Sequence, residues 1–188
     1  MNVQEATTRR LPDLKGRYLP ENCRETINSI LKETYGYEQF RNLEIYDDLS
    51  KGKEKLCISQ GQLIENVILE AEKAWKGETQ VDNILLTAPT GSGKSLLFQL
   101  PAIYLGKEYN LLTIVVSPLK ALIVDQVESL QELGYTRVAY ASSDLSPEQK
   151  MEVYRQVREG EIDLFYLSPE LLLSYDIKHF VGERRIGL

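Results

Sequence analysis

The sequence predicts an α/β protein in which a parallel sheet is flanked by helices and preceded by a helical N-terminal extension. From Asp82 onward, short β-prone runs alternate with helical stretches, as in parallel strands joined by right-handed crossovers. Two of these runs, NILLTA and LLTIVV, are mostly apolar and do not alternate regularly with polar residues. This pattern is typical of central strands that are covered on both faces.

Each element of this sheet follows from the same alternation. The predicted strands are residues 83–88, 111–117, 137–142 and 163–168, and the predicted helices between them are residues 95–105, 119–133 and 147–159. We therefore assign residues 82–188 to one α/β domain.

The residues before this domain have a different pattern. Residues 1–20 show no period and are expected to be loose, whereas residues 21–81 are expected to form the helical extension. Apolar residues at three- and four-residue steps predict an amphipathic helix over residues 59–76, and a second helix is expected over residues 21–34. The polar, charged residues at about 46–56 predict a solvated loop between the two helices.

Composition narrows the classes of partner. The net charge of −6 argues that any binding of nucleic acid is made by a local groove and not by a basic surface. The apolar runs are too short to span a bilayer, and no membrane partner is expected. The two cysteines lack metal-ligand companions and are expected to be reduced thiols, which favours a cytoplasmic location.

The stretch APTGSGKS, residues 88–95, fits the pattern of a phosphate-binding loop between a strand and a helix. Its backbone N–H groups would converge on phosphate oxygens, helped by the start of the helix. The residues expected to form this cradle are Thr90, Gly91, Ser92 and Gly93. Lys94 would bridge the β- and γ-phosphates, and the Ser95 hydroxyl would be a ligand of Mg²⁺. The sequence therefore predicts a site for a nucleoside triphosphate.

Two further strands end in a Ser-Pro dipeptide, at Ser117-Pro118 and at Ser168-Pro169. In a parallel sheet both turns lie at the carboxyl edge, where ligands bind. Hydroxyl groups and a lysine at the starts of helices can hold a nucleic-acid backbone. A purely local role, with serine capping a helix and proline in its first turn, accounts for the same residues.

The stretches TAPTGSGKSLLFQLPAIYL, VVSPLKALIVDQV, YASSDLSPEQK and LFYLSPELLL resemble successive motifs of superfamily 2 helicases of the DEAD/DEAH type, in particular the RecQ-like DNA helicases. This resemblance covers residues 84–173. It implies a RecA-like first motor domain, ATP and Mg²⁺ as cofactors, and single-stranded or partly duplex DNA as partner. In that family the two Ser-Pro turns grip the phosphates of one strand. The residues at the matching positions are Ser117, Pro118, Lys120, Ser168, Pro169 and Glu170.

The stretch YGYEQFR, residues 35–41, resembles the part of RecQ-like enzymes that helps to hold adenine, which implicates Arg41. The family then places a glutamine three residues after the arginine, where this chain has Glu44. Gln60 and Gln62 follow later, and either is a candidate for reading adenine. Ser59 and Gln62 also satisfy the pattern of a helix capping box, so a structural role stays open.

Hydrolysis of ATP by such motors needs an acidic pair that holds Mg²⁺. No Asp-Glu pair follows an apolar strand in this sequence, and residues 186–188 resemble the start of the strand that carries it in the family. We therefore expect an incomplete first motor domain that binds nucleotide but does not hydrolyse ATP efficiently by itself, with a second RecA-like domain further along the protein.

For the whole protein, this interpretation predicts an ATP-dependent DNA helicase or translocase. Two alternatives stay open: a nucleotide-gated nucleic-acid-binding module without hydrolysis, and a phosphotransferase that uses the same loop on a small molecule.

Overall fold

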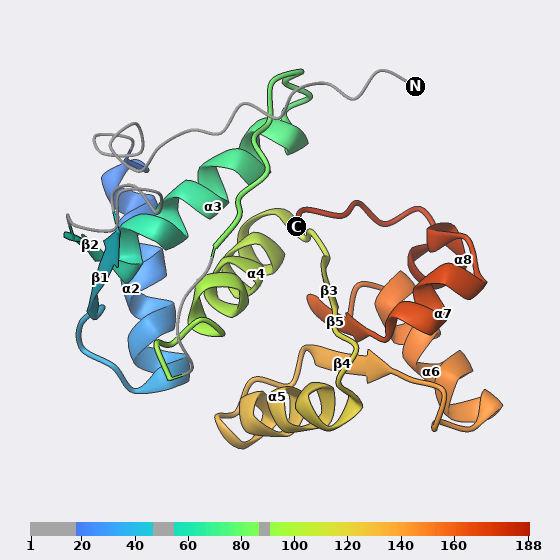
Figure 1. Cartoon of the computed structure of the whole chain (residues 1–188). Coiled ribbons are helices and arrows are strands. Elements are labelled where there is room, and N and C mark those ends of the chain that lie inside the picture. Colours follow the sequence, from blue (N-terminus) through green and yellow to red (C-terminus); the bar gives the residue numbers. More distant parts are fainter. Residues whose placement is uncertain (1–17, 47–54, 87–90) are drawn as a thin grey trace. The chain divides into compact units, whose positions relative to one another are not determined.

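The computed structural model describes residues 18–46, 55–86 and 91–188 (Figure 1). The chain forms two compact units, one of residues 1–31 and 37–101 and the other of residues 32–36 and 102–188. Most of the segment expected to be loose, residues 1–20, lies outside the described residues. Its last part is held in place, because Leu19 is buried and its N–H donates to Glu65 Oε2 at 3.0 Å.

The first unit contains two helices and a hairpin. Helix α2 (Glu21–Tyr35) and helix α3 (Gln60–Trp75) agree closely with the predicted helices at 21–34 and 59–76. Between them, β1 (Asn42–Tyr46) and β2 (Lys55–Ser59) form an antiparallel pair in which Asn42 is opposite Ser59. The extension is therefore not helical throughout, and most of the predicted polar loop, residues 47–54, lies outside the described residues.

The second unit is built around a parallel sheet in the order β3-β5-β4. Its strands are β3 (Thr113–Val116), β4 (Val138–Ala141) and β5 (Leu164–Leu167). Its helices are α5 (Lys120–Glu132), α6 (Pro147–Arg158), α7 (Pro169–Ser174) and α8 (Ile177–Val181). Helix α4 (Leu96–Tyr109) begins in the first unit and ends in the second. The three strands and the alternation with α4, α5 and α6 confirm the α/β prediction.

The predicted strand at 83–88 is wrong over its described part, because residues 83–86 are not in a strand and Leu85 is 91% exposed. A strand requires a hydrogen-bonding neighbour. Strand β3 pairs with β5 on one side. On its other side Leu112 forms a parallel bridge with Ile186, and Ile114 N–H donates to Leu188 O at 2.9 Å. An apolar run thus predicts a strand only where a partner edge is present.

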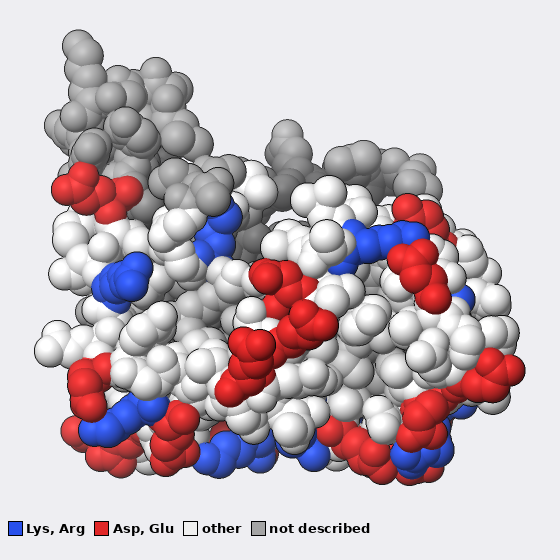
Figure 2. All heavy atoms as spheres, turned by 90° about the horizontal axis from the view of Figure 1, so that it is seen from below, with Lys and Arg blue, Asp and Glu red and all other residues white. Residues whose placement is uncertain are grey.

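Charged side chains of both signs are scattered over the face of the molecule drawn in Figure 2, most of which is formed by other residues. Lysine and arginine side chains are interspersed with aspartate and glutamate on that face and do not merge into a continuous basic patch. This distribution agrees with the net charge of −6.

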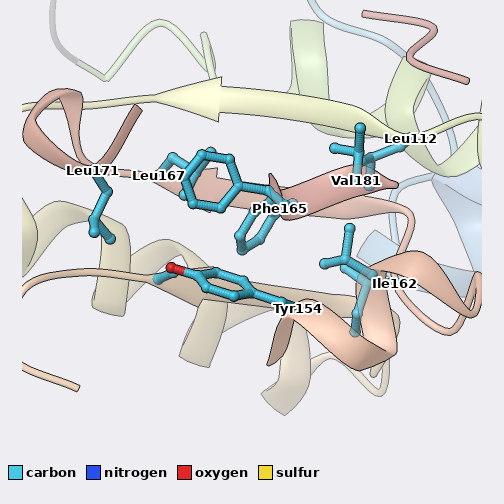
Figure 3. Packing of buried hydrophobic residues seen from close by; sticks show 10 residues of the cluster. Leu112, Tyr154, Ile162, Phe165, Leu167, Leu171 and Val181 are labelled. Atoms are coloured by element: carbon cyan, nitrogen blue, oxygen red, sulfur yellow. The ribbon is translucent and has the colours of Figure 1, made fainter. Parts of the chain in front are cut away.

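The core of the second unit lies between β5 and helices α6 and α8 (Figure 3). Phe165, at the centre of β5, has no exposed surface and lies edge-on to Tyr154 of α6, with ring centroids 6.4 Å apart. Tyr154 also meets Phe180 of α8 edge-on at 5.1 Å. Such pairs add about 0.5–1.5 kcal/mol to the burial of the rings. The ten residues of this cluster are Leu112, Ala141, Tyr154, Val157, Ile162, Phe165, Leu167, Leu171, Phe180 and Val181.

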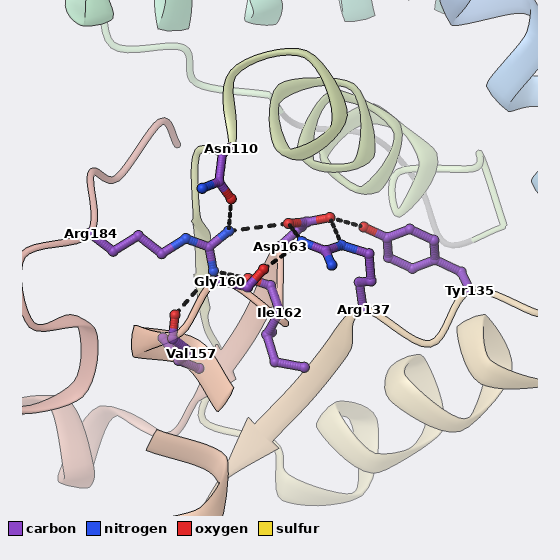
Figure 4. A network of polar contacts seen from close by, with 8 residues as sticks. All are labelled: Asn110, Tyr135, Arg137, Val157, Gly160, Ile162, Asp163 and Arg184. Atoms are coloured by element: carbon purple, nitrogen blue, oxygen red, sulfur yellow. Dashed lines mark hydrogen bonds and ion pairs between the residues drawn. The ribbon is translucent and has the colours of Figure 1, made fainter. Parts of the chain in front are cut away.

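A buried carboxylate, Asp163, joins the amino ends of the strands (Figure 4). Asp163 immediately precedes β5 and is 2% exposed. Arg137, immediately before β4, binds it through two bonds, from Nε to Oδ2 at 2.7 Å and from Nη2 to Oδ1 at 2.8 Å. The Tyr135 hydroxyl donates to Oδ2 at 2.9 Å, and Arg184 Nη2 donates to Oδ1 at 3.1 Å.

The two arginines extend this cluster to backbone carbonyls. Arg137 donates to Gly160 O at 2.6 Å, and Arg184 donates to Val157 O at 3.2 Å and to Ile162 O. Burial and the negative charge of Asp163 raise the pKa of the Tyr135 hydroxyl above its ordinary value, so the phenol stays protonated as a donor. The cluster fixes the start of β4, the start of β5 and the segment that leads to Ile186 relative to one another.

Replacement of Asp163 by asparagine is expected to lower the free energy of unfolding by about 3–5 kcal/mol, because it leaves the buried Arg184 and the partly exposed Arg137 facing a neutral amide. Chemical denaturation followed by circular dichroism measures this change. Glu152→Gln is the matched control, because Glu152 forms an exposed ion pair with Arg155 and its loss should have little effect. Equal stability of Asp163→Asn and the unmodified chain would contradict the structural role.

Candidate nucleotide and nucleic-acid sites

In the described part of the predicted phosphate loop, residues 91–95, both glycines have a positive φ. Gly91 and Gly93 have φ of 81° and 79°, a region that favours glycine. Helix α4 begins at Leu96, and Ser95 O accepts the first helical hydrogen bond from Gln99 N–H at 2.9 Å. Lys94 and Ser95 therefore lie at the start of α4, as expected. Thr90 lies outside the described residues.

Gln60 links this loop to the rest of the first unit. Its side-chain Nε2 donates to Ser92 O at 3.3 Å and approaches Gly93 O at 3.5 Å, and its Oε1 accepts from Arg41 N–H at 3.2 Å. The residue is 2% exposed. Because Gln60 binds carbonyl oxygens of the loop, it does not compete for the N–H groups that a phosphate would need. A Cβ at Gly93 would lie 2.5 Å from this Nε2, so the contact also excludes larger residues there.

These contacts distinguish Gln60 from Gln62, the two candidates for reading adenine. The amide of Gln60 is buried and already bonded to the protein at both ends, so in this structure it is not available to adenine. Gln62 lies two residues further along α3 and is half-buried. Two helical positions correspond to a rotation of about 200°, so the side chains of Gln60 and Gln62 leave the helix on nearly opposite sides. The capping residue of α3 is Ser59, whose hydroxyl accepts from Gly61 N–H at 3.2 Å.

The β1–β2 hairpin brings Arg41 next to Gln60 although 18 residues separate them in the sequence. Gln60 N–H donates to Arg41 O at 2.9 Å, which closes the hairpin at its base. The Phe40 ring lies against Gly61, where a Cβ would be only 2.6 Å from Phe40 Cδ2. The guanidinium of Arg41 is exposed and lies 6.0 Å from the centre of the Tyr37 ring. This hairpin was not predicted, although the alternating runs NLEIY and KLCIS are typical of paired strands.

The two Ser-Pro turns of the second unit lie at the ends of adjacent strands. Ser117 follows β3 and its N–H donates to Leu167 O at 3.1 Å, while Ser168 follows β5 and its N–H donates to Ala141 O at 3.4 Å. The ladder thus continues beyond the strands and aligns the carboxyl ends of β3, β5 and β4. The Ser117 hydroxyl accepts from Leu119 N–H at 3.3 Å, and helix α5 starts at the next residue.

The two turns differ in exposure. Pro118 and Glu170 are exposed, and Ser117, Pro169 and Lys120 are half-buried. Ser168 has no exposed surface, so its hydroxyl does not face a ligand at the surface. The expected direct grip of a phosphate by the Ser168 side chain therefore has no support in this structure, because the chain folds over that hydroxyl at the end of β5. The described turn offers Pro169 and Glu170 to the surface instead.

Lys120 is the first residue of α5 and follows the turn after β3. Its Nζ donates to Ser143 Oγ at 2.6 Å and to Asp144 Oδ1 at 2.8 Å, both in the loop after β4. The hydrogen bond from Lys120 is the largest cause that lowers the pKa of the Asp144 carboxyl. The pKa of Glu170, after β5, is also lowered, mainly by its own backbone N–H and by the Ser168 side chain, with a smaller effect of the Lys120 charge. Lys120 thus joins the turn after β3 to the loop after β4.

The described residues include neither a cluster of metal-binding side chains nor a membrane-spanning helix. Within residues 18–46, 55–86 and 91–188, no group of three His, Cys, Asp or Glu side chains could hold a metal ion. In the same part of the chain, no helix is both long enough and apolar enough to cross a bilayer. Ser95 is the one predicted magnesium ligand, and it lies half-buried at the start of α4.

Comparison with known proteins adds the family. Residues 62–185 match the DEAD/DEAH box helicase family. An ATP-dependent DNA helicase RecQ of Synechocystis is 32% identical over 88% of this chain and 28% of its own length. RecQ proteins of Haemophilus influenzae and Bacillus subtilis are 31% and 32% identical, over 86% and 79% of this chain and 21% and 20% of their own lengths.

The chain thus spans less than a third of the length of these relatives. Its match to the family model includes the start of α4, the sheet of the second unit and both Ser-Pro turns. The chain belongs to the DEAD/DEAH box helicase family and is RecQ-like.

Proposed function

We propose that this chain is the ATP-binding part of the first motor domain of a RecQ-like, ATP-dependent DNA helicase or translocase. The observation that carries the proposal is the glycine loop at the start of α4. The side chain of Gln60 holds this loop by donating to the loop's carbonyl oxygens. That arrangement leaves backbone N–H groups for phosphate oxygens, and the start of a helix favours negative charge. The family match and the RecQ relatives support the same reading.

The residues present fit a triphosphate with its magnesium ion. Gly93 leaves no space for a Cβ, and the Ser92 hydroxyl is buried without a partner among the described residues. In this proposal Lys94 neutralises the β- and γ-phosphates, and the Ser95 hydroxyl is the protein's ligand to Mg²⁺. Arg41 and Gln62 are assigned to the adenine, and Gln60 is assigned to the support of the loop.

On the second unit, we assign the ends of β3 and β5 to the nucleic-acid backbone. Lys120 supplies the positive charge, and Ser117 and Pro118 form the turn that presents it. Glu170 and Pro169 form the neighbouring turn, and Ser168 supports that turn from inside. The absence of a continuous basic patch on the face in Figure 2 agrees with a grip made by few, local groups.

For the whole protein we propose a cycle in which ATP binding closes two RecA-like domains over DNA and hydrolysis releases them. Hydrolysis would require an acidic pair to hold Mg²⁺. We propose that the present chain alone binds ATP without efficient turnover. Clear turnover by this chain would contradict that part of the proposal. A full-length protein that binds ATP and DNA without turnover would instead favour a nucleotide-gated binding module.

Replacement of Lys94 by alanine is expected to weaken the binding of Mg·ATP by about tenfold or more, because a charge-assisted contact contributes about 1.5–3 kcal/mol. Titration with a fluorescent ATP analogue measures the dissociation constant. Lys107→Ala is the matched control, because Lys107 is an exposed lysine near the other end of the same helix. The proposal fails if both variants bind ATP as the unmodified chain does.

The two glutamines are expected to behave differently. Gln62→Ala should reduce the preference for ATP over GTP by about three- to tenfold, because it removes the side-chain amide that is proposed to hydrogen-bond to the base. Gln60→Ala should weaken the binding of ATP and of GTP by similar factors, because it loosens the loop that holds the phosphates common to both nucleotides. Competition titrations with the two nucleotides separate these effects. An unchanged preference in Gln62→Ala would remove its assignment to adenine.

The double variant Ser117→Ala, Lys120→Ala is expected to bind single-stranded DNA more weakly while its affinity for ATP stays the same. The loss of one phosphate contact should also reduce the slope of log affinity against log salt by about 0.7. Fluorescence anisotropy over a salt series gives both quantities. Lys178→Ala, which removes an exposed lysine of α8, is the control and should change neither. Equal DNA affinity in the double variant would remove the assignment of this turn.

A further inference from the structure

The Lys120 ammonium is already engaged in the free chain. It binds Asp144 Oδ1 at 2.8 Å and Ser143 Oγ at 2.6 Å, and the side chains of Lys120 and Asp144 are 42% and 67% exposed. An ammonium group has three donors, so these two contacts leave one for a further acceptor. A phosphate that takes Lys120 as a full partner has to replace the aspartate.

The pair is not a by-product of helix spacing. The ion pairs of Lys73 with Glu70 and of Lys76 with Glu72 join neighbouring turns of one helix. Lys120 and Asp144 are instead 24 residues apart and join the first residue of α5 to the loop after β4. Such a contact forms only because the parallel sheet places the ends of β3 and β4 on the same edge, one on each side of β5.

The loop that carries Asp144 is held independently of Lys120. Ser146 caps α6 with a complete capping box, and Lys150 of α6 donates to Ser143 O at 3.4 Å. The loop therefore keeps its place when Lys120 exchanges partners. Exposed ion pairs are weak, because water and salt screen both charges, so the exchange is readily reversible.

We propose that Asp144 acts as an intramolecular competitor for Lys120, which a phosphate group of single-stranded nucleic acid displaces on binding. The proposal rests on the proposed nucleic-acid function of the strand ends. In the free chain the aspartate holds the lysine beside Ser143 and masks its charge. On binding, the lysine bonds to phosphate while the carboxylate is left in solvent next to the strand. Asp144 thus lowers the affinity of the chain for single-stranded nucleic acid and makes this affinity less dependent on salt.

The test uses this chain and a short fluorescein-labelled oligothymidylate, with fluorescence anisotropy over a series of salt concentrations. Asp144→Asn is expected to bind about two- to fivefold more tightly, which is the range for one exposed ion pair. Its log–log salt slope should be steeper by up to about 0.7, because the lysine is no longer neutralised in the free state. A gain in affinity distinguishes this role from damage to the fold, which would lower the affinity.

Two controls isolate the pair. Glu132→Gln makes the same change in net charge at the far end of α5, about 18 Å from Lys120 along the helix, and should leave affinity nearly unchanged. In a Lys120→Ala background, Asp144→Asn should lose most of its effect. If the gain persists there in full, the aspartate acts as a general repelling charge, and the proposed competition is wrong.

The outcomes also separate this inference from the function on which it rests. If the unmodified chain binds the oligonucleotide and Asp144→Asn binds no more tightly, the inference is overturned while the nucleic-acid site stands. If no variant binds the oligonucleotide, the proposed nucleic-acid site fails and the inference with it.

Discussion

The second unit depends on one buried carboxylate. Asp163 accepts from Arg137, Arg184 and Tyr135 at the amino edge of the sheet, where β4 and β5 begin and where the segment leading to Ile186 passes. Gly106 of α4 is required beside it, because a Cβ there would lie 2.3 Å from the carboxylate carbon. Loss of Asp163 would leave the buried Arg184 without its counter-charge.

This constraint has a consequence at the other edge of the sheet. The parallel register that starts at Asp163 ends at Ser117, Ala141 and Ser168, so the three carboxyl ends finish level with one another. Beyond these ends, the turns carry exposed residues such as Pro118 and Glu170. The contact of Lys120 with the loop after β4 is a result of this register.

In the first unit Gln60 has a comparable linking role. It joins Arg41, at the base of the hairpin, to the carbonyl groups of the phosphate loop, and its burial leaves the other face of α3 to Gln62. Arg41 and Gln60 are far apart in the sequence, and the pairing of β1 with β2 brings them together.

The sequence was sufficient for features that depend on local patterns. Helices α2, α3, α5 and α6 start within one or two residues of the predictions, because capping residues and three- and four-residue spacing mark them directly. The strand at 83–88 was predicted from its apolar run, but a strand also needs a neighbour, which periodicity does not reveal. The hairpin, the burial of Ser168 and the partners of Asp163 and Lys120 depend on contacts between distant residues. No local pattern encodes those contacts.

The central claim is that backbone N–H groups of residues 91–95 bind the phosphates of ATP. Hydrogen–deuterium exchange of these amides with and without Mg·ATP tests it most directly. The account predicts slower exchange in the loop and the first turn of α4 on addition of Mg·ATP, and no change in α8. Unchanged exchange in the loop at a concentration of Mg·ATP that saturates binding would contradict the account.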